Sequence, residues 1–219
     1  MRKGVTLLFA FLPLLHGRTA IAQPALGFWG GLNRASLKGD APENASYGTR
    51  LGLSAGVVGE FNLTKDVKLS LQPAYFQRGA KIAFEVPDQD EPRDSLQVKL
   101  DYYSLPVLLK VVSGNGKTYV TSGLDFGILS HAELSNLNTD EPAQDLKKFF
   151  QDVDVAVNFG FGAMLPLGSP LLTLELRYSQ SLANLSKSEE NPEASALPER
   201  FRSSGLQLMA GLLWPLGKN

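Results

Sequence analysis

The sequence has no cysteine among its 219 residues and only two histidines. The absence of thiols excludes a disulfide scaffold and a thiolate metal site. An excess of basic residues is also missing, because 21 Lys and Arg stand against 22 Asp and Glu and no basic arm is present. Nucleic-acid binding through phosphate contacts requires such an excess. We therefore expect no nucleic-acid partner, no bound metal and no cofactor.

Long hydrophobic runs are lacking as well. The longest apolar run is too short for a transmembrane helix, whereas a hydrophobic content of 43% is too high for a disordered chain. The chain also contains 21 glycines and 13 prolines. The class that remains is a globular or barrel-like domain rich in β-structure.

The first 22 residues have the pattern of an export signal. Arg2 and Lys3 precede an apolar segment over 5–15, and a small-x-small pattern ends at Ala22. We expect residues 1–22 to be a cleaved signal peptide, and the protein to be exported.

The mature chain, 23–219, has the size of one domain. It has 18 Lys and Arg and 22 Asp and Glu, which gives a net charge of about −4. Its dominant pattern has a period of two residues, which is typical of β-strands with two different faces. This pattern predicts clear strands over 50–63, 67–78, 153–162, 172–179 and 206–214, and less regular ones over 25–37, 96–112 and 117–131.

The connections between these eight strands alternate in length. Short turns are expected at 64–66, 113–116 and 166–170, and long polar connections at 38–49, 86–95, 132–151 and 184–202. This alternation, with strands near the ~10 residues needed to cross a bilayer, is typical of outer-membrane barrels. The prediction is an all-β fold, an eight-stranded antiparallel transmembrane β-barrel with short periplasmic turns and long extracellular loops, located in the cell outer membrane.

Alternation alone does not say which face is wet, since a soluble lipocalin-like barrel turns its apolar face inward. In the membrane interpretation, the inward face carries five cations and four anions, which can pair in a narrow lumen filled by side chains. We call this set the lumen charge network: Arg50, Glu60, Lys68, Arg78, Lys110, Asp125, Asp154, Glu175 and Arg177. Many glycines also fall on this inward face, where a narrow barrel has least room. On the apolar face, Tyr75, Tyr178 and Trp214 are candidate interfacial aromatics, although ordinary sheet packing explains each one equally well.

Two segments depart from the regular pattern. Val98 and Leu100 are out of phase with the apolar residues from Tyr103 onward, and a bulge near Asp101 would reconcile them. Residues 143–150 have helical spacing, but a loop packed on the rim is the preferred interpretation.

Several short motifs resemble the PorT-like outer-membrane β-barrel family of bacteria, in matching order along the whole mature chain. They are Gly31-Leu32-Asn33, Leu71-Gln72-Pro73 with Gln77-Arg78-Gly79-Ala80-Lys81, Tyr102-Tyr103-Ser104-Leu105-Pro106 with Lys110, Gly160 with Gly162, and Leu174 to Tyr178. The resemblance implies an outer-membrane barrel found mainly in Bacteroidetes and their relatives. Most members have no defined biochemical activity, and the namesake is associated with protein secretion and gliding. The chain departs from the family at Ala74 and Ser104, where glutamates are frequent.

The expected function is that of a structural, interaction or export-associated barrel rather than an enzyme. Expected partners are the lipid bilayer, the barrel-assembly machinery during biogenesis, and surface or secretion-system proteins, with the chain itself a monomer. Two alternatives stay open. One is a soluble periplasmic lipocalin-like carrier of a hydrophobic ligand, supported by the Gly27-x-Trp29 motif. The other is a small lipid hydrolase at the rim, in which His131 would activate Ser130.

Overall fold

A computed structural model describes residues 24–39, 45–84, 93–139, 142–187 and 200–216 of the chain. The expected signal peptide over 1–22 lies outside these ranges. Within them, no helix has the length and hydrophobicity needed to cross a membrane.

The fold is all-β and antiparallel, as the sequence predicts. The strands of the main sheet are β1 (Ala25–Gly39), β2 (Ala45–Asn62), β3 (Val67–Leu71), β4 (Ala74–Phe84), β5 (Arg93–Val112), β6 (Thr118–Asn136), β8 (Val153–Pro166), β9 (Leu171–Ser181) and β10 (Phe201–Pro215). A two-residue strand, β7 (Gln144–Asp145), pairs beside β6, and a 3-10 helix, η1 (Lys147–Phe149), follows it.

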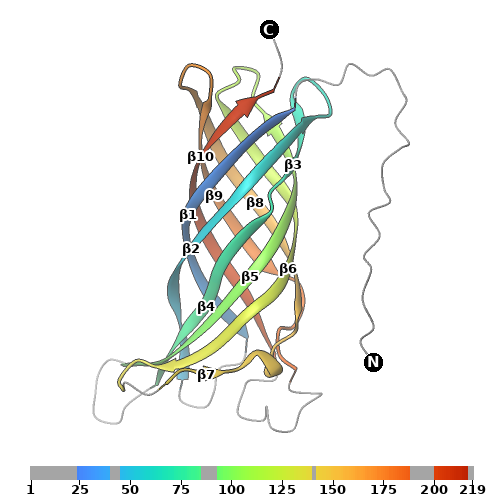
Figure 1. The fold of residues 1–219 in the computed structure, drawn as a ribbon. Coiled ribbons are helices and arrows are strands. Elements are labelled where there is room, and N and C mark those ends of the chain that lie inside the picture. Colours follow the sequence, from blue (N-terminus) through green and yellow to red (C-terminus); the bar gives the residue numbers. More distant parts are fainter. Residues whose placement is uncertain (1–23, 40–44, 85–92, 140–141, 188–199, 217–219) are drawn as a thin grey trace, which may run out of the picture.

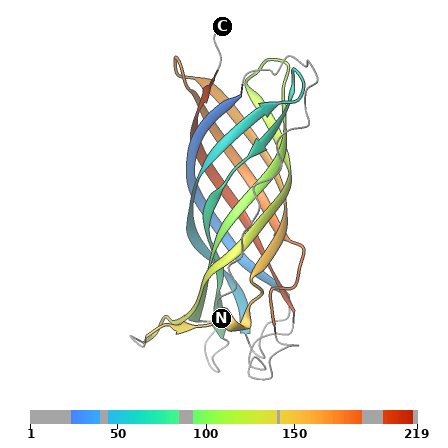
Figure 2. The same ribbon diagram turned by 45° about the vertical axis from the view of Figure 1, so that its right-hand side comes forward.

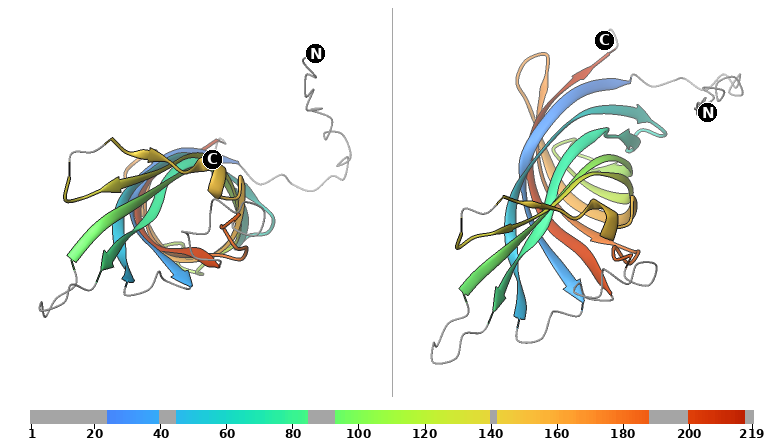
Figure 3. Two further views of the ribbon diagram at one scale, coloured as in Figure 1. Left: turned by 90° about the horizontal axis from the view of Figure 1, so that it is seen from below. Right: turned by 60° about the horizontal axis from the view of Figure 1, so that its bottom comes forward.

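The strand pairings form a closed ring. The order is β1, β2, β4, β5, β6, β8, β9 and β10, and β10 pairs with β1 again. Strand β3 also lies between β2 and β5, so β3 and β4 are two parts of one position, separated at Gln72 and Pro73. Because Pro73 has no N–H to donate, a break in the ladder is favoured there. The ring therefore has eight positions, and its tilted strands enclose an interior (Figures 1 and 3).

The two ends of the ring differ (Figure 2). At one end, here the turn end, tight turns join β2 to β3, β5 to β6 and β8 to β9, as the sequence predicts, and β10 also ends there. At the other, the loop end, lie the strand ends that the longer connections join. Their predicted bounds are wrong in places, since β1 continues to Gly39 and β2 already starts at Ala45. Ladder pairing extends strands into polar sequence, where the apolar alternation has already stopped.

The predicted bulge lies on a different strand. Strand β5 keeps one phase from Leu96 to Lys110, with Val98, Leu100 and Tyr102 all buried. The extra residue is Ser130 on β6, between Leu129, which pairs with Tyr102, and His131, which pairs with Asp101. Val98 and Leu100 are apolar and yet face inward, because the interior itself is apolar at this level.

Candidate functional site

The interior of the ring carries most of the buried polar side chains of the described chain. They come from inward positions on every strand of the main sheet, and eight of the nine residues in the lumen charge network are buried. The exception, Lys68, has a side chain that is 19% exposed. Sequence alternation alone places these residues on one face, and the structure shows which of them meet.

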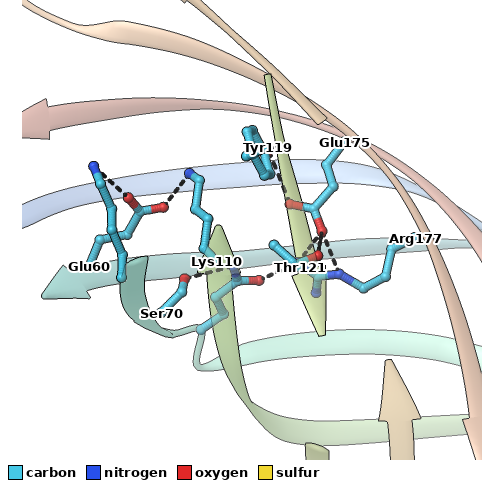
Figure 4. A network of polar contacts seen from close by, with 9 residues as sticks. Glu60, Ser70, Lys110, Tyr119, Thr121, Glu175 and Arg177 are labelled. Carbon is cyan, nitrogen blue, oxygen red and sulfur yellow. Dashed lines mark hydrogen bonds and ion pairs between the residues drawn. The ribbon is translucent and has the colours of Figure 1, made fainter. Parts of the chain in front are cut away.

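A first cluster lies near the turn end. The Glu60 carboxylate sits between two ammonium groups, with its Oε1 at 2.5 Å from Nζ of Lys110 and its Oε2 at 3.5 Å from Nζ of Lys68 (Figure 4). Lys110 Nζ also lies 4.0 Å from the ring centroid of Tyr119. An anion shared by two cations and a ring face keeps these buried charges compensated.

The second cluster is centred on Glu175 (Figure 4). Its carboxylate accepts hydrogen bonds from the Tyr119 hydroxyl at 3.1 Å, from Thr121 Oγ1 at 2.9 Å and from Arg177 Nε at 2.8 Å. Arg177 also donates through Nη2 to Gln72 Oε1 at 2.9 Å. These contacts join β6 and β9 across the interior to the break between β3 and β4.

A third cluster surrounds Arg78, in the middle of the barrel. The guanidinium donates through Nη2 to Asp125 at 2.5 Å and through Nη1 to Asp154 at 2.8 Å. It also lies over the rings of Phe76 and Tyr102, at 5.4 and 5.0 Å from their centroids. Arg78 is therefore held by charge on two sides and by aromatic faces on the others.

The last member of the lumen charge network, Arg50, contacts no carboxylate among the residues that the structure describes. Its guanidinium donates to the backbone carbonyl of Arg78.

The hydroxyl of Ser181 adds a hydrogen bond to Asp154 at 2.8 Å. Sequence reasoning missed the neutral partners of these charges, although their inward alternation positions could have identified them: Gln72, Tyr119, Thr121 and Ser181.

Apolar side chains fill other parts of the interior: a turn-end layer lies at the level of the first cluster, since Ala25 pairs with Glu60, and a loop-end layer lies toward the loop end. The turn-end layer contains Ala25, Trp29, Val58, Phe76, Met209 and Leu213. The loop-end layer is larger and contains Leu37, Ala80, Ile82, Val98, Leu100, Tyr102, Leu129, Ala132, Leu146, Phe150, Leu185 and Phe201. Two of its members, Leu146 and Phe150, flank η1, so this loop segment packs against the loop-end mouth of the barrel.

A cavity of about 30 Å³ lies between Trp29, Glu60, Lys110, Glu175 and Met209. This volume is sufficient for one or two water molecules. Among the described residues, no group of three or more His, Asp or Glu is placed to hold a metal ion.

The outer wall has the opposite character. Large apolar side chains are exposed along the outward positions of the strands, as Leu51, Leu53 and Val57 show on β2 and Leu124, Phe126 and Ile128 on β6. We call this surface the apolar belt. A soluble carrier would place its apolar face inside, so this distribution contradicts the lipocalin-like alternative.

The three candidate interfacial aromatics all lie on the outer wall. Tyr75 donates to Oδ2 of Asp101 at 2.7 Å, where the apolar belt meets polar residues, and its ring lies 5.6 Å from that of Tyr103. Tyr178 is 39% exposed on β9. Trp214, near the turn end, stacks at 5.5 Å against Phe28.

The proposed Ser-His pair lies beyond the apolar belt, at the bulge on β6. His131 Nε2 is 2.7 Å from Oε1 of Glu133, and this hydrogen bond raises the pKa of the imidazole above its ordinary value and lowers the pKa of Glu133. The Ser130 hydroxyl instead donates to the backbone carbonyl of Asp101 at 3.0 Å. The histidine therefore forms an ion pair with a neighbouring carboxylate, while the serine is bound to the adjacent strand.

Comparison with known proteins yields one family match. The model of a family described as outer membrane protein beta-barrel domain matches residues 21–187. No curated protein sequence matches the chain.

Several solved structures are similar at low identity. Ail of Yersinia pestis has 15% identity and a TM-score of 0.42, with 88% of this chain and 99% of that chain covered. Neisserial surface protein A has 13% identity and a TM-score of 0.45, with 87% and 98% covered. OprG of Pseudomonas aeruginosa has 14% identity and a TM-score of 0.44, with 89% and 96% covered.

Proposed function

The chain belongs to the outer membrane protein β-barrel domain family, and from this premise we propose that it is a non-conducting integral barrel with a structural and interaction role. The observation that carries the proposal is the inverted distribution of side chains. Charged groups are paired inside the ring, whereas large apolar groups cover the outside. A surface of this kind is stable in the hydrocarbon region of a bilayer and unfavourable in water.

The proposed orientation follows from the two ends of the ring. Outer-membrane barrels have short periplasmic turns and longer extracellular connections. We therefore assign the turn end to the periplasm and the loop end to the cell exterior. In this orientation, β7 and η1 lie on the side of the cell exterior. The described parts of the long connections are then available to surface or secretion-system partners.

The lumen is proposed to be filled and closed. Two apolar layers and three charged clusters share the interior, and open aqueous channels are found in barrels of ~16 strands rather than eight. The purified protein in planar bilayers should therefore show no ion conductance. Stepwise nanosiemens openings would contradict the filled lumen while leaving the membrane location intact.

Membrane integration has its own tests. In mild detergent, the intact barrel should migrate differently on a gel from the boiled chain, and carbonate washing should leave it in the membrane fraction. Release of the chain into the soluble fraction would contradict the proposal.

Within the family, we propose the PorT-like type. The motif residue Arg78 lies at the centre of the third cluster, and Lys110 in the first, so two positions that carry the resemblance also hold the interior together. An association with protein export would follow from that type. Co-purification of a secretion component with the affinity-tagged barrel from its own cells would support it, and capture of assembly machinery alone would count against it.

No catalytic role is proposed. The Ser130 hydroxyl is bound to a backbone carbonyl, and His131 is paired with Glu133. A His131→Ala variant should behave like the parent protein in any lipid-hydrolysis assay. Loss of a measurable hydrolase activity in this variant would overturn this part of the proposal.

A further inference from the structure

The cavity of about 30 Å³ near the turn end is bordered by three polar atoms that lack a hydrogen-bond partner. Trp29 on β1, Glu60 on β2 and Arg177 on β9 all line this cavity. Among the residues that the structure describes, nothing hydrogen-bonds to Nε1 of Trp29, Oε2 of Glu60 or Nη1 of Arg177, and all three atoms are buried. Nζ of Lys68 lies 3.5 Å from Oε2 of Glu60, which is longer than an ordinary hydrogen bond.

A buried polar atom of this kind is unfavourable, because folding removes it from water without a replacement hydrogen bond. Trp29 is only 7% exposed and belongs to the turn-end apolar layer, although a buried indole N–H ordinarily finds an acceptor. Arg177 uses Nε and Nη2 for Glu175 and Gln72, which leaves Nη1 over (Figure 4). Three such atoms around one cavity indicate a common partner inside it.

The size and the lining of the cavity are suited to water. A bound water requires roughly 10–15 Å³ of free space and about two to four polar partners. The volume of about 30 Å³ meets the first requirement, and the three unpartnered atoms meet the second. An apolar cavity of similar size would stay dry, whereas this one has charged and neutral polar groups in its wall.

The types of the three atoms decide between a water molecule and an anion. Nε1 of Trp29 and Nη1 of Arg177 carry protons and are donors, whereas Oε2 of Glu60 is an acceptor. A water molecule can accept from both nitrogens and donate to the carboxylate at the same time. An anion could only accept, and it would lie beside the carboxylates of Glu60 and Glu175, which both line the cavity.

We propose that this cavity is the binding site of a structural water molecule, which accepts hydrogen bonds from Trp29 and Arg177 and donates one to Glu60. The water joins the first charged cluster to the second, because Glu60 belongs to one and Arg177 to the other. The joined network extends from Lys68 near the turn end to Gln72 at the break between β3 and β4. The inference rests on the filled lumen proposed above and deepens it, since side chains and a bound water fill this part of the interior together.

NMR of the full-length folded protein in deuterated detergent micelles tests the proposal. The chain has only two tryptophans, so a Trp214→Phe variant assigns the indole proton Hε1 of Trp29. In a nuclear Overhauser spectrum, this proton should show a cross-peak at the water frequency with the sign of a bound, slowly exchanging water. A rotating-frame spectrum separates this signal from direct exchange of Hε1 with solvent.

Three variants locate the water. Val58→Ile extends a buried inward side chain into the cavity, so the cross-peak should be lost. Val57→Ile, the same change at the adjacent outward position, is the matched control and should keep the cross-peak. Val58→Ala enlarges the cavity and should also keep it, which distinguishes filling of the cavity from any change at Val58.

Three results would overturn the water site. A parent protein that shows no cross-peak, although Hε1 is protected from exchange, has a dry cavity. An unchanged cross-peak in Val58→Ile places the water elsewhere. A saturable shift of Hε1 when chloride replaces gluconate at constant ionic strength identifies a bound anion as the ligand.

Failure of the proposed function gives a different result. Rapid exchange of Hε1 with solvent, together with its broadening by a water-soluble gadolinium chelate, would contradict the filled lumen itself. Protection of Hε1 from both, without a bound water, contradicts the water site alone.

Discussion

At the scale of single residues, the chain depends on buried charges that each have a specific partner. Arg78 is 4% exposed and holds two carboxylates that are equally buried, Asp125 and Asp154. A buried ion pair adds little stability compared with a well-packed apolar alternative. Removing one partner, however, leaves an uncompensated charge in a medium of low polarity, and this makes Arg78 a sensitive point of the interior.

The Arg78→Met variant should lower the free energy of unfolding by about 3–5 kcal/mol. Reversible unfolding by guanidinium chloride in lipid vesicles measures this change. Lys65→Met, at an exposed turn position, is the matched control and should change stability by less than about 0.5 kcal/mol. Combining Arg78→Met with Asp125→Asn and Asp154→Asn should restore part of the loss, and a loss below about 1 kcal/mol in the single variant would refute the uncompensated-charge argument.

The pair of His131 and Glu133 predicts a local pH dependence outside the membrane. The raised pKa of His131 means that its contribution to stability is complete below its ordinary pKa and is lost as the pH rises through the folded value. The lowered pKa of Glu133 means that its contribution is complete above its ordinary value and is lost as the pH falls. The contact is therefore strongest between the two ordinary pKa values, in mildly acidic solution.

Titration of the His131 imidazole by NMR should show a pKa above its ordinary value, and Glu133→Gln should bring it back down. Lys65→Gln serves as the control for a general change in charge. An unchanged His131 titration in Glu133→Gln would show that the hydrogen bond does not form in solution.

At the scale of elements, β5 and β6 come close together because an inward position lacks a side chain. A Cβ added at Gly123 would overlap the carbonyl oxygen of Val107 and lie 2.8 Å from Cα of Leu108. Both are backbone atoms of the neighbouring strand, so they cannot move aside without opening the ladder. A glycine is therefore required at this position by packing and not by an unusual φ.

Gly123→Ala should destabilise the barrel by roughly 1–3 kcal/mol, because it overpacks a closed ladder. Gly114→Ala in the turn between the same strands is the matched control, since nothing lies within 4 Å of its added Cβ. The gel mobility shift between folded and boiled forms, followed against temperature, compares the two. Equal melting of both variants would contradict the close approach of β5 and β6.

Much of the arrangement of the strands could be predicted from the sequence. The period of two residues gives the strands and their inward and outward faces, because a barrel wall imposes that alternation on every strand. It could not give the inward placement of Val98 and Leu100, because the interior changes from charged to apolar along its axis and hydrophobicity no longer marks the outer face. It also could not give the contacts across the lumen, such as Arg177 with Gln72, which depend on strand tilt and register.

At the scale of the whole molecule, composition alone would suggest an ordinary soluble chain. The mean hydropathy is −0.06, because inward charges and outward apolar residues average to near zero. The closed ring separates these two populations in space. It leaves an outer wall suited to lipid and an interior in which a cavity of about 30 Å³ has space for one or two waters.

The most direct test of this account uses the absence of native cysteine, which allows single spin labels to be placed without background. In bilayers, labels at Leu124 and Phe126 should collide frequently with oxygen and rarely with a water-soluble nickel complex. A label at the inward Thr121 should be protected from both. Protection of Leu124 and Phe126 from both reagents would indicate a soluble carrier, and exposure of Thr121 to nickel would indicate a water-filled pore; either result would contradict a membrane barrel with a filled lumen.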